Sequence, residues 1–143
     1  MVRYYNDDTR YRYPEKRRTA RWLAQVAEAE GFRLGEVTYV FCSSQRLLEM
    51  NRQFLGHDYF TDVITFDYSD RRGTKIVAGD IFIDVETVAD NARLYGATTL
   101  GEMRRVVVHG VLHLCGQKDK SPRANARMHR KEDRYLRLWN EIE

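Results

Sequence analysis

Two histidines lie four residues apart in an otherwise apolar segment, His109 and His113 within Thr98–Cys115. Helical positions four apart differ by about 40° around the axis, so both imidazoles project from one face, where they could chelate a metal ion. Gly116 lets the chain turn back, and Asp119 follows three residues later. Two imidazoles and a carboxylate suit one zinc ion per chain, although another divalent metal is compatible. Three protein ligands leave a fourth position for water, as in catalytic sites.

Other interpretations of this segment are weaker. Two histidines can simply satisfy hydrogen bonds in a core, but the glycine and the third ligand favour metal binding. His129 is a minor alternative to Asp119 as third ligand. Cys115 lies about 240° around the helix from His109, which indicates a small core residue. The position of the catalytic glutamate in the zinc-peptidase pattern His-Glu-x-x-His is held by Gly110, which argues against such a peptidase.

The histidine segment is predicted to be a buried central helix, because it is apolar on most faces. Thr99 and Glu102 have the spacing of a capping box at its start, and Gly116 is a natural stop. The other elements expected from periodicity and turn residues are helices from Pro14 to about Glu30, Ser43 or Ser44 to Gly56, Asp84 to Gly96 and about Asn125 to Trp139, and strands at Val2–Tyr5, Val37–Cys42, Asp62–Tyr68 and Lys75–Asp84. The last two strands resemble a hairpin with a turn at Asp70–Gly73. The expected fold class is α+β, with a small mixed sheet of about four strands packed by helices.

Length and composition narrow the class of protein. The 143 residues fit a single domain, 1–143, with a real hydrophobic core. No apolar stretch approaches transmembrane length, and the N-terminus lacks the hydrophobic region of a signal peptide. Two cysteines form no disulfide framework and fit a reducing compartment. We therefore expect a cytoplasmic protein with no membrane partner, and no obligate oligomer is evident.

The formal net charge of +3 is unevenly distributed, with basic ends and an acidic middle. Basic residues crowd the segment after the histidines, namely Lys118, Lys120, Arg123, Arg127, Arg130, Lys131, Arg134 and Arg137. A basic rim beside a metal site suggests a polyanionic substrate such as nucleic acid, with Lys118, Lys120 and Arg123 as substrate contacts. The plain alternative is a solvated helix with Glu132 and Asp133 interspersed.

Two further groups of residues are ambiguous. The tyrosines at positions 4, 5, 11 and 13 alternate with arginines and could stack on bases, but half-buried tyrosines more often cover a core edge. Asp62 and Asp80 could orient metal ligands or cap turns.

Three motifs together resemble the YbeY family. They are His109-Gly110-x-Leu112-His113-Leu114-x-Gly116, Thr61-Asp62-Val63-Ile64-Thr65-Phe66 and Gly79-Asp80-Ile81-x-Ile83. The resemblance covers most of the chain from about Val37 onward. It implies a bacterial, zinc-dependent endoribonuclease that works in rRNA maturation, particularly at the 3′ end of the small-subunit rRNA, and in ribosome quality control. It also implies ribosomal RNA, the ribosome and ribosome-associated proteins as partners.

The first departure from that family's pattern is Asp119, which stands where the family carries a third histidine. A carboxylate offsets part of the metal's charge, so the bound water should be less acidic than in an all-histidine site. We expect activity at higher pH, or with a different divalent ion, than in all-histidine relatives. A pH–rate profile of this protein and of Asp119→His tests this expectation, and identical profiles would contradict it.

The second departure is Leu55, four residues after Asn51, where the family carries an arginine thought to contact the substrate phosphate. Arg52 or His57 could substitute as the phosphate contact, although either one alone reads more readily as an ordinary surface residue.

Three functions compete. The leading one is a metal-dependent endoribonuclease, with either water or the ribose 2′-hydroxyl as nucleophile. The second is an RNA-binding ribosome-assembly factor in which the metal is structural, which the missing arginine and the absent glutamate both favour. The third, a peptidase or small-molecule hydrolase, is disfavoured by Gly110 and by the basic flanks.

Overall fold

The computed structural model describes all residues 1–143 and contains one four-stranded sheet. The strands are β1 (Val2–Asn6), β2 (Arg33–Cys42), β3 (Val63–Asp67) and β4 (Ile76–Asp84), in the order β1-β2-β4-β3. The first three strands in that order are parallel, and β3 pairs antiparallel with β4 as a hairpin. The predicted α+β class with a mixed four-stranded sheet is confirmed.

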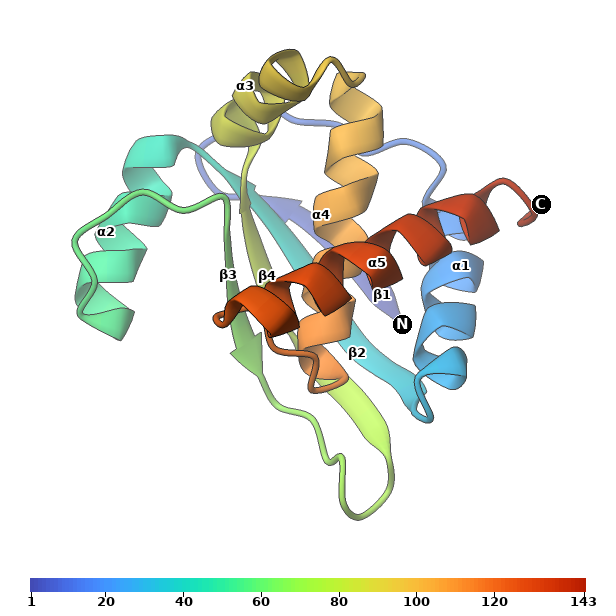
Figure 1. The fold of residues 1–143 in the computed structure, drawn as a ribbon. Helices are drawn as coiled ribbons and strands as arrows, with labels where there is room; N and C mark the ends of the chain where they lie inside the picture. Colours follow the sequence, from blue (N-terminus) through green and yellow to red (C-terminus); the bar gives the residue numbers. More distant parts are fainter.

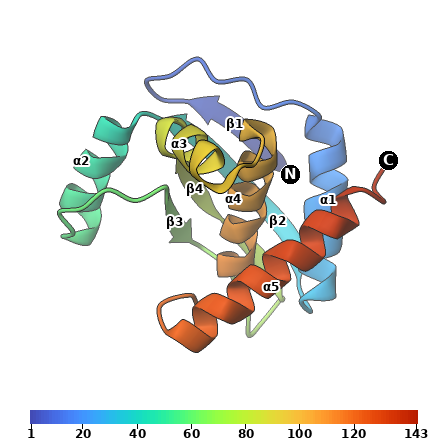
Figure 2. The ribbon, with the colours of Figure 1, turned by 45° about the horizontal axis from the view of Figure 1, so that its top comes forward.

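Five helices surround this sheet (Figure 1). They are α1 (Lys16–Ala29), α2 (Ser44–Leu55), α3 (Val85–Tyr95), α4 (Thr99–Leu114) and α5 (Pro122–Trp139). Helix α4, which carries the histidines, lies across one face of the sheet, and α5 crosses α4 on its outer side (Figure 1). Figure 2 shows α2 set apart from the other helices, beyond β3. No helix combines the length and apolar character that a membrane span requires.

The two faces of the sheet bury different residues. The β2 side chains of Val37, Tyr39 and Phe41 alternate into the main core of 23 residues, together with Ile81 and Ile83 of β4. Trp22 and Leu23 of α1 and most apolar residues of α4 complete this core. The opposite face carries a small cluster at α2, formed by Cys42, Leu47, Met50 and Ile64. The period of two along each strand thus directs one set of residues to α4 and the other to α2.

Several element boundaries differ from those expected. Strand β2 begins at Arg33 rather than Val37, because Arg33 and Leu34 pair with Ile76 and Val77 before a register shift. Helix α5 begins at Pro122 with Ser121 as its cap, three residues before the expected start. Both extensions depend on pairing or capping that an apolar pattern does not reveal.

The capping box predicted at the start of α4 is wrong by one residue. The N-cap is Thr98, whose hydroxyl accepts a hydrogen bond from the Gly101 amide, while Thr99 is the first helical residue. Glu102 does not reach back to the cap, because it is buried in the cleft described below.

The tyrosines near the N-terminus mostly cover a core edge, the favoured of the two interpretations. The Tyr4 ring stacks on the ring of Tyr13 with centroids 5.2 Å apart, and the ring of Tyr11 packs on that of Phe41. Tyr5 alone of the four is well exposed.

Gly110 is where α4 meets the sheet most closely. A Cβ atom at this position would lie 2.7 Å from Cδ1 and 2.9 Å from Cγ2 of the buried Ile81 side chain. A larger side chain at this position requires Ile81 or α4 to move. This contact explains physically why a peptidase-type glutamate is absent beside His109.

Gly110→Ala should therefore destabilise the protein, although alanine is the better helix former. Overpacking a core costs about 1–3 kcal/mol, whereas the helix propensity of alanine returns at most about 1 kcal/mol. Denaturant unfolding should show a lower free energy of unfolding, partly restored by Ile81→Val, which removes the nearest methyl group. A variant more stable than the wild type would show that α4 can shift freely.

Candidate metal centre

The turn after α4 brings Asp119 back toward the two histidines. Gly116 has a φ of +92°, and its amide bonds to the His113 carbonyl while the Gln117 amide bonds to that of Leu112. This is the hydrogen-bond pattern of a Schellman motif, in which glycine tolerates the left-handed backbone. The chain is thereby reversed within two residues, as the sequence predicts.

Three ligand atoms converge at this point. His109, His113 and Asp119 each offer one nitrogen or oxygen, and these atoms lie within 4.8 Å of one another. Asp119 Oδ2 is 3.4 Å from His109 Nε2 and 3.2 Å from His113 Nε2. In tetrahedral coordination with bonds of about 2.0–2.1 Å, neighbouring ligand atoms are about 3.3 Å apart. The donor set and its spacing therefore fit a tetrahedral metal ion with one position left for another ligand.

The other nitrogen of each imidazole is held by an outer partner. His109 Nδ1 is 2.5 Å from Glu132 Oε2, and His113 Nδ1 is 3.0 Å from the Gln117 carbonyl oxygen. Both partners accept hydrogen bonds, so a neutral imidazole carries its proton on Nδ1 and keeps the Nε2 lone pair free for a metal ion beside Asp119. Such outer contacts fix the tautomer and the ring orientation of metal-binding histidines.

Glu132 is the functional residue that sequence reasoning missed. Only 1% of it is exposed, and it also accepts hydrogen bonds from Arg105 (2.9 Å) and from His129 Nδ1 (3.0 Å). The plain alternative of a solvated helix, with Glu132 as one of its interspersed charges, is wrong for this residue. Hydrogen bonds from Arg105, His109 and His129 compensate the buried negative charge of Glu132.

The pKa values of His109 and His113 are shifted in opposite directions. Burial disfavours the charged form of His109, but the hydrogen bond and charge of Glu132 outweigh burial and raise its pKa. Burial and the neighbouring His109 lower the pKa of His113. Burial acts to raise the pKa of Glu132, but its contacts with His109, Arg105 and His129 together outweigh burial and lower it. Glu132 therefore stays ionised, and if a metal binds here, His109 is the residue at which protons would compete with it.

The ligands lie in a cleft of about 960 Å³ that is bordered by α2, β3, α3, α4 and α5. Its lining includes the carboxylates Asp62, Asp67, Glu102, Asp119 and Glu132. Asp62 and Glu102 accept no hydrogen bond from another side chain, and burial raises the pKa of each. The cleft floor is thus rich in carboxylates.

The predicted substrate contacts lie beside this cleft. Lys120 lines it, whereas Lys118 and Arg123 are exposed and are not part of its lining. Lys131 pairs with Glu30, but the other basic residues of this segment form no ion pair and are exposed. A positively charged surface therefore follows the first turns of α5.

Of the two residues that could replace the missing arginine as a phosphate contact, only one lines the cleft. Arg52 does not line the cleft, because its Nε lies 2.5 Å from Asp58 in an exposed ion pair. His57 and Leu55 both line it. Helix α2 therefore contributes no free arginine to the cleft.

Four other residues that the sequence singles out lie outside the set of three converging side chains. His129 lines the cleft but turns its Nδ1 to Glu132, and it is not among the three converging ligands. Cys115 packs against the main core, and burial raises the pKa of its thiol to about 12. Asp62 lines the cleft without a hydrogen bond to either ligating histidine. Asp80 accepts a hydrogen bond from the Tyr68 hydroxyl instead of orienting a ligand.

Comparison with known proteins shows where the chain belongs. The family model described as "Endoribonuclease YbeY" matches residues 4–140. The chain belongs to the YbeY family. Among the relatives named Endoribonuclease YbeY, that of Bacteroides thetaiotaomicron is 46% identical over 124 residues, 87% of this chain and 88% of the relative. The YbeY of Cytophaga hutchinsonii is 44% identical over 135 residues, 94% of this chain and 93% of the relative.

A solved structure agrees with the fold. The solution structure of a Thermotoga maritima protein superposes with a TM-score of 0.64 at 26% identity, covering 99% of this chain and 91% of the other. The match to YbeY proteins extends beyond the part from Val37 onward that carries the resembling motifs, and it includes the end of β1 and all of α1. The relatives' name describes enzymes that cut within RNA chains, so the family is one of hydrolytic endonucleases.

Proposed function

We propose that this YbeY protein is a metal-dependent endoribonuclease that cuts single-stranded RNA, with zinc as the metal and one ion per chain. The observation that carries the proposal is the convergence of His109 Nε2, His113 Nε2 and Asp119 Oδ2 in an open cleft. Two imidazoles and one carboxylate are a zinc-like donor set, and three protein ligands are typical of catalytic zinc.

The charge pattern around the cleft supports RNA as the substrate. Carboxylates on the cleft floor repel a phosphodiester, so a phosphate can approach the ligands only when a cation offsets that charge. Lys120 at the rim and the exposed Arg123 and Arg127 on α5 provide positive charge for the flanking phosphates. This combination selects a polyanion that bridges the rim and reaches the metal.

Each residue has a separate role in the proposed reaction. His109, His113 and Asp119 would hold the metal, and Glu132 keeps His109 in the tautomer that can bind it. A bound divalent metal supplies Lewis acidity, which polarises a phosphoryl oxygen and acidifies water. Asp62 and Glu102 are the cleft carboxylates with raised pKa and no ion pair, and they are suited to accept the proton of the attacking hydroxyl.

We further propose that the cellular substrate is ribosomal RNA, with maturation of the small-subunit 3′ end and ribosome quality control as the roles. The support is the family resemblance together with the basic surface beside the cleft. Work on ribosomes would place the protein in the cytoplasm, where its two free cysteines are chemically compatible with reducing conditions.

An alternative function is favoured by one observation. Leu55 occupies the cleft position where a phosphate-binding arginine would be expected, and Arg52 is committed to Asp58. A protein that binds RNA during ribosome assembly, with a structural metal and little catalysis, would not need that arginine.

Cleavage of a single-stranded fragment from the small-subunit rRNA 3′ end tests the proposal. The purified protein should cut this fragment. Chelation of the metal should stop cleavage and added zinc should restore it, while the same sequence in a duplex should stay intact. Elemental analysis of the same sample should give one metal per chain. Tight RNA binding without cleavage under any metal would favour the assembly factor, and absence of metal binding would refute both functions.

A further inference from the structure

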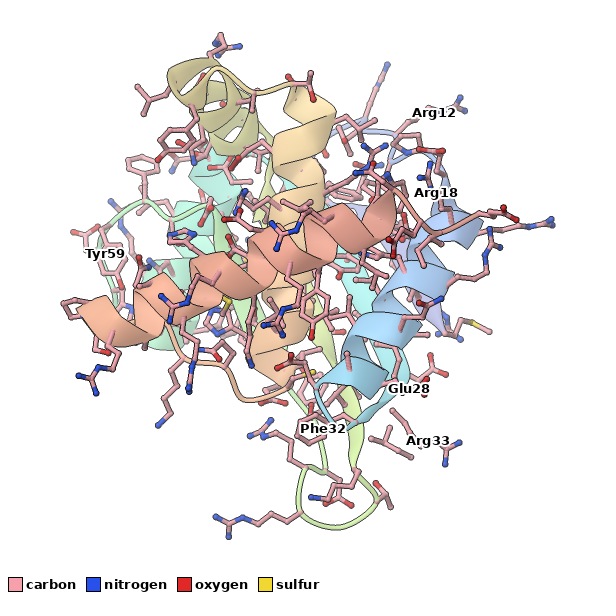
Figure 3. All side chains as sticks on the ribbon, turned by 45° about the vertical axis from the view of Figure 1, so that its right-hand side comes forward. Arg12, Arg18, Glu28, Phe32, Arg33 and Tyr59 are labelled. Carbon is pink, nitrogen blue, oxygen red and sulfur yellow. The ribbon has the colours of Figure 1, made fainter.

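The loop that follows α2 carries an exposed tyrosine, Tyr59, which lines the cleft. Tyr59 is 54% exposed, and its ring stacks on His57 with centroids 5.1 Å apart and planes 18° apart. The Tyr59 hydroxyl also lies 3.0 Å from His57 Nδ1. In Figure 3 Tyr59 lies at the outer edge of the molecule, on the side where α5 begins. The two rings thus lie stacked, with Tyr59 the more exposed of the two.

The loop that carries this ring pair is held in place by a buried amide. Asn51 is 1% exposed, and its side chain donates a 2.8 Å hydrogen bond to the Tyr59 carbonyl. Its own backbone carbonyl accepts a hydrogen bond of 3.0 Å from the His57 amide. The Arg52–Asp58 ion pair ties the loop to α2 between these points. The position of the rings is therefore set before any ligand arrives.

The ring pair belongs to the same cleft as the metal ligands. Tyr59 and His57 line it together with His109, His113 and Asp119. Lys120 also lines this cleft, so the basic side chain, the three candidate ligands and the rings all face the space that one RNA chain would occupy. The loop thus offers a flat aromatic surface where the α2 arginine of the family pattern is missing.

We propose that the Tyr59–His57 pair is a stacking site for one unpaired nucleobase of the RNA, next to the phosphodiester at the metal ligands. This inference rests on the proposed function and adds the chemistry of substrate selection. Every nucleobase has a π-face, so the site tolerates different sequences. Bases in a duplex already stack on their neighbours, and splaying one out requires a single strand or a loop. On this side of the cleft, stacking on a base would therefore hold the RNA in place of an arginine–phosphate contact.

The first test measures stacking without cleavage. A 2′-O-methyl oligonucleotide with 2-aminopurine at successive positions is mixed with the full-length, metal-loaded protein, and its integrity is checked on a gel. One position should be quenched by the wild type and by Tyr59→Phe, but not by Tyr59→Ala, which should bind about tenfold more weakly. The matched control is Tyr68→Ala, since Tyr68 is 65% exposed, bonds to Asp80 and does not line the cleft.

The second test compares cleavage of intact RNA with RNA that lacks one base. An abasic nucleotide at the quenched position should slow the wild type as much as Tyr59→Ala slows cleavage of intact RNA, and the two changes should not add. Equal quenching by Tyr59→Ala and Tyr68→Ala, or additive losses, would overturn the stacking site while leaving the nuclease intact. Position-specific quenching by a wild type that cuts no RNA would instead support the stacking site and refute the nuclease.

Discussion

His113→Ala is expected to lose the metal and to reduce RNA cleavage to background. His113 Nε2 lies 3.2 Å from Asp119 Oδ2, and its removal leaves two ligands that cannot define a tetrahedral site. The loss of metal affinity should exceed the roughly 100-fold that marks the upper range for loss of an outer partner. Elemental analysis after gel filtration and cleavage of the single-stranded fragment should be run on the same samples.

His129→Ala is the matched control for this experiment. It removes an imidazole from the same cleft, 56% exposed, that contacts Glu132 but is not among the converging ligands. We expect it to keep one metal per chain. Loss of metal in His129→Ala, with metal retained in an Asp119→Ala variant, would show that His129 is the third ligand instead of Asp119.

Glu132→Gln should weaken metal binding by about 10–100-fold and lower cleavage to a similar extent, because an outer partner of a ligating histidine is altered. The carboxylate accepts hydrogen bonds from His109, Arg105 and His129 at once. An amide has one oxygen and one NH₂ group, so it cannot accept from all three donors. Its nitrogen must face either the His109 Nδ1 proton or a cationic neighbour.

The pH dependence of this variant gives a second readout. Glu132 raises the pKa of His109, and a proton on His109 Nε2 excludes the metal. In the wild type, metal affinity should therefore start to fall at a higher pH than in Glu132→Gln. The ratio of the two affinities should be largest at alkaline pH and should shrink as pH is lowered. A constant ratio would mean that Glu132 supports the fold without setting the proton affinity of His109.

Asp133→Asn provides the control for Glu132→Gln. Asp133 binds the same guanidinium, with Arg105 Nη2 2.7 Å away, but it is half exposed and contacts neither imidazole. Its substitution should leave metal affinity unchanged. Similar losses in both variants would assign the effect to Arg105 rather than to His109.

The ligand-bearing part of the fold was accessible from sequence because its information is local. The apolar run around His109 predicts a buried helix, Gly116 predicts its end, and the turn places Asp119 within reach, all within one short stretch. Strand β2 was less accessible, because its first residues are extended by pairing with β4, far along the chain. Local patterns do not encode such register.

Glu132 illustrates why the rest of the site was missed. It sits between Lys131 and Asp133, so its sequence neighbours suggest a solvated helix. A usable signal was nevertheless present. Met128, Tyr135 and Trp139 form the buried stripe of α5, and Glu132 falls on it at helical spacing. An acidic residue within an apolar stripe needs a buried cationic or protonated partner, and a neighbouring helix with two histidines supplies one.

The compact ligand set has a consequence for how this protein can change. His109, His113 and Asp119 occur within a single stretch of helix and turn, so bringing them together closes only a short loop and costs little conformational entropy. The cleft around them draws on α2, β3, α3 and α5, which the whole tertiary structure must assemble. Under the proposed function, the three residues that would hold the ion and the loop that would contact RNA therefore lie on different segments, although Glu132 of α5 links the ligands to the tertiary structure. A lineage can remodel the loop at Tyr59 or the first turns of α5 without dismantling the motif that captures the metal.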